Sequence, residues 1–122
     1  MCYNLIMNED IRLMVKIYKT YEVDWMGDPF SDISALTKHH IVKKENGGEN
    51  GISNYALLTR KSHDLLHFLE TNYYEDYVNL NRLFLELNRS VKPPTIEYYS
   101  EVKKIVKRVK KSIKNSKRVR RK

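Results

Sequence analysis

The sequence predicts an α+β fold, in which a β-hairpin and the helix that follows it are flanked by further helices. Two strand-like segments, LTKHHIVK at 36–43 and NYALLT at 54–59, enclose the polar loop ENGGENGIS. Gly47 and Gly48 mark a turn within this loop. Beyond the second strand, apolar residues recur at spacings of three and four, which is the period of an amphipathic helix. A hairpin followed by helices is therefore the expected core.

The helix after the hairpin is expected to begin at His63, with Ser62 as its N-cap. Residues 71–90 carry aromatic and aliphatic side chains at helical spacing and predict a second helix. The double proline at 93–94 ends it, and a last helix is expected from Thr95 or Ile96. Before the hairpin, the chain fits either a helix from about Glu9 or a short hairpin, and residues 21–26 are strand-like.

The length of 122 residues predicts one domain with a small core and an appended helix or tail. The only cysteine is Cys2, so neither a disulfide within the chain nor a Cys-x-x-Cys zinc site is expected. No apolar run approaches the roughly 18 residues of a membrane span, and early acidic residues disfavour a signal peptide. We therefore expect a cytoplasmic protein without a membrane partner.

The net charge of +8 is divided unevenly along the chain. Residues 1–102 contain 11 Lys and Arg against 15 Asp and Glu, a net of −4, whereas residues 103–122 contain 12 basic residues and no acid. Apolar residues from Val102 to Ile113 follow helical spacing, so one face of this segment is expected to dock while the other presents lysines. Such a segment can bind phosphates without reading sequence. A solubilising tail and an anionic membrane surface are the alternatives.

All four histidines lie within 29 residues, from His39 to His67. His63 and His67 are spaced i, i+4 and lie on one helix face, where both rings can reach one ion. Imidazole is the commonest metal ligand and titrates nearest neutrality. The cluster can therefore bind a metal and keep one histidine for proton transfer, which is typical of a metal-dependent hydrolase. A zinc protease is disfavoured, because its motif needs glutamate where this chain has Asp64.

The segment HHIVKKENGGENGISNYALLTRKSHDLLH resembles the HNH nucleases, in which a ββα-metal (His-Me finger) fold surrounds one divalent ion. His40, Asn54 and His63 match the three residues of the signature. The doubled histidine at its start and the histidine pair at its end are most similar to the colicin-type DNases. The resemblance covers about residues 36–70. Small phage and bacterial proteins share this layout. The resemblance therefore implies that the protein comes from a phage or mobile element and is located in a bacterial or phage-infected cell.

The resemblance implies a role for each matched residue. His39, His63 and His67 would hold the metal, His40 would be the general base, and Asn54 would hold the loop at the catalytic site. The implied activity is metal-dependent hydrolysis of DNA phosphodiester bonds, with RNA as a further substrate class. Three neutral imidazoles favour zinc or another transition ion, and magnesium, which prefers oxygen ligands, is left open.

Four parts of the chain follow: an N-terminal flank at 1–30, the HNH motif at 31–70, helices at 71–114 and a disordered basic tail at 115–122. The alternative function is a non-catalytic nucleic-acid-binding module with a structural metal, although structural zinc usually has four protein ligands. Candidate nucleic-acid contacts flank the motif and fill the tail: Lys43, Lys44, Arg60, Lys61, Lys117, Arg118, Arg120 and Arg121.

Overall fold

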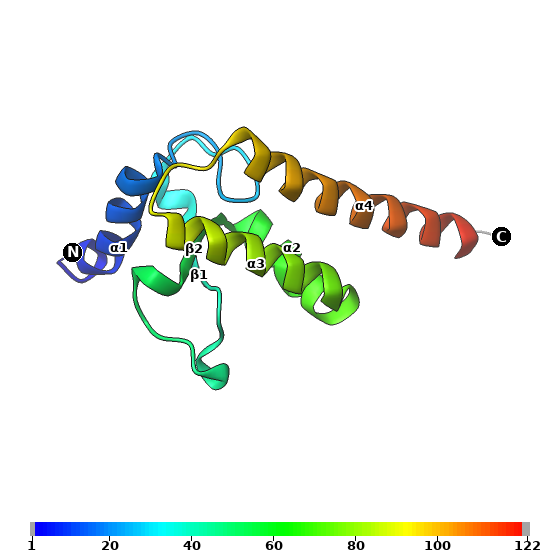
Figure 1. Ribbon diagram of the computed structural model, residues 1–122, viewed down its shortest axis with the longest axis horizontal. Helices are drawn as coiled ribbons and strands as arrows, with labels where there is room; N and C mark the ends of the chain where they lie inside the picture. Colours follow the sequence, from blue (N-terminus) through cyan, green and yellow to red (C-terminus); the bar gives the residue numbers. More distant parts are fainter. Residues whose placement is uncertain (1, 121–122) are drawn as a thin grey trace.

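A computed structural model describes the backbone of residues 2–120 and the side chains of residues 9–116. A two-stranded antiparallel sheet is surrounded by helices (Figure 1), which confirms the predicted α+β class with a ββα core and flanking helices. Along the chain the elements are α1 (Cys2–Tyr18), β1 (Leu36–His40), β2 (Tyr55–Thr59), α2 (Arg60–Asn72), α3 (Tyr74–Ser90) and α4 (Ile96–Arg120).

The sheet pairs β1 with β2 from Leu36 opposite Thr59 to His40 opposite Tyr55. Every residue of β2 is buried, because α2 and α3 both pack against it. A strand covered in this way is apolar along its length, as the run Ala56, Leu57 and Leu58 illustrates. The hairpin therefore forms the base on which α2 presents its histidines.

The loop between the strands is held by the side chain of Asn54, which is 6% exposed. Its Oδ1 accepts from the backbone N–H of Val42, and its Nδ2 donates to the carbonyls of Val42 and Glu49, each at 2.9 Å. A Cβ on Gly48 would lie 1.8 Å from the Val42 oxygen, so this close approach requires glycine. These contacts therefore fix the loop at Val42 and at Glu49. Strand β1 ends at His40, whereas the sequence predicted a strand that continues to Lys43.

Two local expectations are corrected by the structure. Residues 21–26 do not form a strand; they contribute one isolated bridge, between Val23 and Pro29, because the Asp24 side chain bonds the following backbone into a turn. Helix α2 begins at Arg60 rather than His63, and its N-cap is Thr59 rather than Ser62. The N-terminal segment, for which a helix and a hairpin were both open, is the helix α1.

The core joins α1, α3 and α4 to the covered sheet. Trp25 and Phe84 are completely buried and lie near each other, with ring centroids 6.5 Å apart. Helix α4 packs on α3 and buries Val102, Ile105 and Val109. Its C-terminal end lies at one extreme of the molecule, away from α1 (Figure 1).

The backbone of α4 is helical to Arg120, although a disordered tail is predicted from residue 115. Lys and Arg are good helix formers, so a composition too polar for a core can still be helical. The side chains of Lys117, Arg118 and Arg120, and the whole of Arg121, lie outside the described residues. Within the described part of the chain, no helix has the length and apolar character needed to cross a membrane.

Candidate metal and catalytic site

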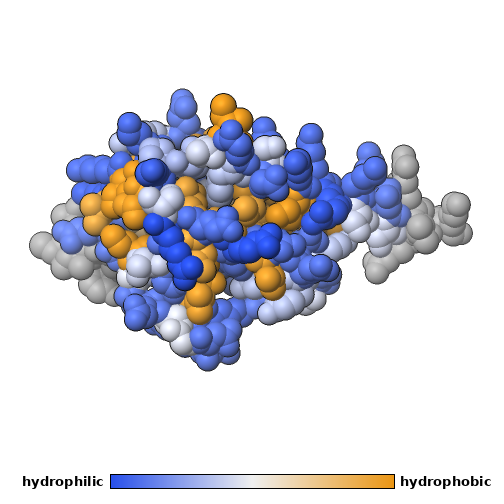
Figure 2. All heavy atoms as spheres, in the orientation of Figure 1, coloured by the Kyte–Doolittle hydropathy of each residue, from blue (hydrophilic) through white to orange (hydrophobic). Residues whose placement is uncertain are grey.

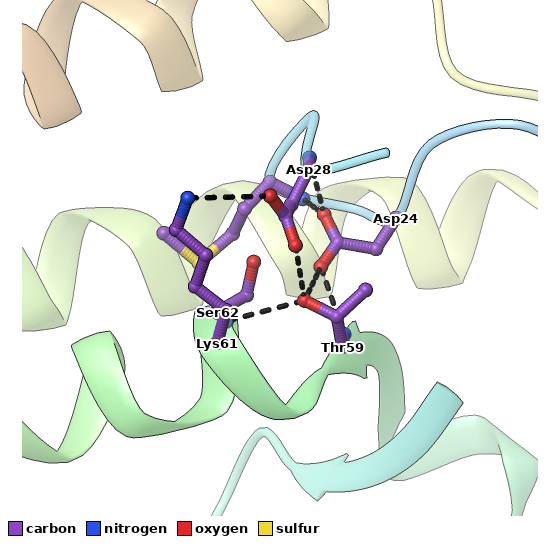
Figure 3. A network of polar contacts seen from close by, with 6 residues as sticks. Asp24, Asp28, Thr59, Lys61 and Ser62 are labelled. Atoms are coloured by element: carbon purple, nitrogen blue, oxygen red, sulfur yellow. Dashed lines mark hydrogen bonds and ion pairs between the residues drawn. The ribbon is translucent and has the colours of Figure 1, made fainter. Parts of the chain in front are cut away.

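The start of α2 is anchored by two aspartates from the segment between α1 and β1 (Figure 3). Asp24 is fully buried, and its carboxylate accepts from the backbone N–H groups of Met26, Asp28 and Thr59 at 2.8–2.9 Å. The Thr59 hydroxyl donates to Asp28 Oδ2 at 2.6 Å and accepts from Ser62 N at 3.2 Å. Since Thr59 ends β2 and caps α2, this network fixes the helix that carries His63 and His67 relative to the sheet.

Thr59→Val is expected to lower the free energy of unfolding by about 1–3 kcal/mol, because an N-cap is lost and Asp28 loses a hydrogen bond. Urea denaturation measures this loss. Thr71→Val is the matched control, since the Thr71 hydroxyl is exposed and makes a single 3.4 Å bond within its own helix. Equal stabilities for the two variants would show that the cap contributes nothing.

All four histidines, two from β1 and two from α2, line one cavity of about 190 Å³. His39 lies on the same side of β1 as Thr37, facing α2, and its ring centroid is 5.6 Å from that of His63. The rings of His63 and His67 stack with centroids 5.0 Å apart. The structure thus brings together His39, His63 and His67, the three residues proposed as ligands.

The protonated nitrogen of His63 is determined by its neighbours. The Thr37 hydroxyl donates to the Leu58 carbonyl at 2.8 Å, so the same hydroxyl oxygen can only accept from His63 Nδ1, at 2.9 Å. The proton therefore sits on Nδ1, and Nε2 carries the lone pair. Metal-binding histidines are usually oriented by such a bond from the other ring nitrogen.

His39 is held in the same manner by α3. Asn81 Nδ2 donates to the Tyr77 carbonyl at 3.2 Å, which directs its Oδ1 toward His39 Nε2 at 2.8 Å. His39 Nε2 is then the donor, and Nδ1 carries the lone pair. A residue 42 positions further along the chain therefore selects the tautomer of the strand histidine.

Burial keeps these imidazoles neutral. Desolvation lowers the pKa of His39 to about 4, an effect that the Asn81 bond opposes and the charges of neighbouring histidines increase. Burial also lowers the pKa of His63, helped by the charges of His67 and Arg60. Near neutral pH both rings therefore present lone pairs, which is the form that coordinates a metal.

A stability prediction follows from His39 in metal-free protein. Its folded pKa of about 4 lies below the unfolded value of 6.5, so the unfolded state binds a proton first as pH falls. The neutral His39 ring therefore contributes its full stabilisation of the folded state above pH 6.5. This contribution, about 3 kcal/mol, is lost as the pH falls toward 4. Urea titrations across this range in chelator should show a flatter profile for His39→Gln than for wild type or Thr71→Val. Parallel profiles for all three would contradict the assignment.

The donor set fits a divalent transition ion, because the three side chains are imidazoles around one cavity. The interplanar angle between His63 and His67 is only 11°, so their in-plane lone pairs run side by side. In the described part of the chain, no group of three or more His, Cys, Asp or Glu side chains has a geometry that could hold a metal. Coordination would therefore require rotation of these rings about their side-chain bonds.

His40 lines the same cavity from the end of β1. Its ring packs edge-on against Tyr55, with centroids 5.2 Å apart, and its Nε2 bonds Asn50 Oδ1 at 2.9 Å. Because the Asn50 oxygen can only accept, His40 Nε2 is the donor and the lone pair of His40 lies on Nδ1. The side chain of Asn54 is occupied by backbone groups of the loop and supports this region.

The four basic residues predicted to contact nucleic acid near the motif differ in their position relative to the histidine cavity. Lys43 lines the histidine cavity and forms an ion pair with Glu70. Arg60 pairs with Asp64 at 3.8 Å, and Lys61 lies 3.9 Å from Asp28. Lys44 is exposed in the loop. Lys43 is therefore the one of these four that lines the cavity.

Several residues that shape this site were not predicted from the sequence. Glu70 and Tyr77 line the cavity, and Asn81 orients His39. Glu70 could have been found, because it follows His63 and His67 at i+7 and i+3 on the same helix face. No local sequence pattern identifies Tyr77 and Asn81, because their contacts with the site depend on how the helices pack.

Comparison with known proteins finds a family match for part of the chain. Residues 27–68 match the HNH endonuclease family. This segment contains the hairpin, its loop and the part of α2 that carries His63 and His67. No curated protein and no solved structure matches the chain. The predicted resemblance is confirmed: the chain carries an HNH endonuclease domain at residues 27–68.

Proposed function

We propose that this protein is a metal-dependent endonuclease that hydrolyses phosphodiester bonds in DNA. The observation that carries the proposal is the cavity in which His39, His63 and His67 meet, two of them with one ring nitrogen bonded to the protein and the other left with a lone pair. These three histidines are the proposed ligands. A divalent ion there would stabilise negative charge on the phosphate and on the departing oxygen.

His40 is the proposed general base. With its Nε2 proton donated to Asn50, its Nδ1 can accept a proton from the water that attacks phosphorus. Asn54 acts as a positioning residue, since its three bonds hold the loop that follows β1. Lys43 would contact the substrate phosphate after leaving Glu70, its partner in the free protein.

The test is incubation of purified protein with supercoiled plasmid in chelator and with zinc, nickel, manganese or magnesium. Nicked and linear products that require an added ion support the proposal. Zinc binding and DNA binding without cleavage under any ion would overturn it in favour of a binding module with a structural metal. A parallel RNA substrate defines the range of nucleic acids cleaved.

The exposed lysines of α4 are expected to supply much of the affinity for duplex DNA. Figure 2 shows hydrophilic side chains along the described part of this helix. Replacing Lys103, Lys107, Lys110 and Lys114 by Gln should reduce the slope of log affinity against log salt by up to about 0.9 for each lost phosphate contact. Substitution is preferable to truncation, because Ile105 and Val109 are buried.

The matched control for the α4 lysines replaces four exposed basic residues of the acidic body by Gln: Lys16, Lys19, Arg82 and Lys92. Both proteins lose the same formal charge. Titrations of labelled duplex at several salt concentrations should give a near wild-type slope for this control. Equal slopes for both variants would show that α4 has no special role in binding DNA.

A further inference from the structure

A second cavity, of about 390 Å³, adjoins the histidine cavity between the loop after β1 and the start of α3. We will call it the α3 cavity. The two cavities share Lys43, Glu70 and Tyr77 in their walls. The histidine cavity, at about 190 Å³, is smaller than the roughly 300–1,000 Å³ typical of small-molecule sites. It has room for a phosphate and an ion, so the remainder of a nucleotide must lie outside it.

The walls of the α3 cavity are unusual for a protein surface. Three large apolar side chains that the fold leaves exposed line it: Val42 at 36%, Tyr74 at 63% and Val78 at 45%. The Tyr74 ring lies beside that of Tyr77, with centroids 5.8 Å apart and planes 30° from parallel. Flat aromatic surfaces of this kind are where unpaired bases stack. Exposed apolar side chains gathered at one place mark a binding site.

Polar groups at the rim suit the edge of a base. Asn46 and Glu45 of the loop line the same cavity, whereas the amide of Asn81, which also lines it, is already bonded to His39 and to the Tyr77 carbonyl. Amide and carboxylate groups pair with the donors and acceptors of nucleobases. Lys43, between the two cavities, is placed to meet the phosphate that joins one nucleotide to the next.

We propose that the α3 cavity binds an unpaired nucleobase next to the scissile phosphate, with the base stacked on Tyr74. This inference rests on the proposed function for the placement of the phosphate. A base can stack there only when it is outside a duplex, because both its faces are covered within one. The preferred substrate is therefore single-stranded DNA, or DNA with a locally unpaired base.

The experiment measures binding in chelator, where no cleavage is expected, by fluorescence anisotropy of a short labelled single-stranded DNA. Tyr74→Ala should weaken binding about 5- to 100-fold, the scale of one stacked base. Tyr74→Phe keeps the ring and should bind within about twofold of wild type. Tyr21→Ala, whose side chain is similarly exposed at 57% but lines neither cavity, is the matched control.

A second ligand isolates the base from the phosphates. Wild type and Tyr74→Ala should bind an abasic oligonucleotide of the same length equally, and the Tyr74→Ala defect should shrink on an intact duplex. Equal loss on the abasic and the base-containing strand would overturn the inference, as would no loss on either or no binding of single-stranded DNA. Since binding is measured without metal, failure of plasmid cleavage alone would contradict only the proposed nuclease activity.

Discussion

His40→Ala is expected to lower the rate of plasmid cleavage by about 10²- to 10⁴-fold, which is the scale of a general base. The physical reason is that no imidazole nitrogen would then accept the proton of the attacking water. Single-turnover rates with saturating metal measure the effect. His40 is half-buried at the end of β1 and is not a proposed ligand, so zinc content and the thermal midpoint should stay near those of wild type.

Two further variants separate proton transfer from structure. Asn50→Ala removes the partner of His40 Nε2 while leaving the imidazole in place, and should cause a smaller loss than His40→Ala. Tyr55→Leu removes the ring against which His40 packs and reports on its position. Normal cleavage by folded His40→Ala would mean that another group activates the water.

His63→Ala is expected to abolish the stabilisation of the protein by zinc. A ligand that binds only the folded state at 100 times its dissociation constant contributes about 2.7 kcal/mol. For a chain of this size, that corresponds to a rise of about 10 °C in the unfolding midpoint. Scanning calorimetry with zinc and with chelator should show this difference for wild type but not for His63→Ala.

The matched control for the metal experiment is His40→Ala, which should keep the response to zinc. Comparing the two variants in chelator separates metal binding from any loss of packing at position 63. A zinc-dependent rise of equal size in His63→Ala would contradict the proposed set of ligands. Measurement of bound zinc per chain gives the stoichiometry independently of stability.

Local patterns predicted the hairpin and the histidine cluster well. The two strands and their turn are encoded by neighbouring residues, and the spacing of His63 and His67 fixes their shared helix face. The start of α2 was misplaced because Thr59 and Ser62 are both good caps, and the sequence alone does not show which hydroxyl reaches a free N–H. The structure selects Thr59, because Asp24 and Asp28 hold it.

Contacts between distant segments were not predictable. The bond between Asn81 and His39 depends on how α3 packs on the sheet, and an asparagine within an amphipathic helix gives no local sign of its partner. The α3 cavity has the same origin, since it lies between a loop of the motif and a helix that follows it. At 21–26 a partly alternating pattern suggested a strand, but the buried carboxylate of Asp24 imposes a turn instead.

The bond from Asn81 to His39 also limits how this domain can be transplanted. The family match ends at Phe68, whereas Asn81 and Tyr77, which contact or enclose the histidines, lie on α3. A chimera that borrowed only residues 27–68 would carry every residue of the motif but leave His39 without the amide that selects its tautomer. Any graft of this domain into another protein should therefore take α3 with it, and relatives should be compared over both segments.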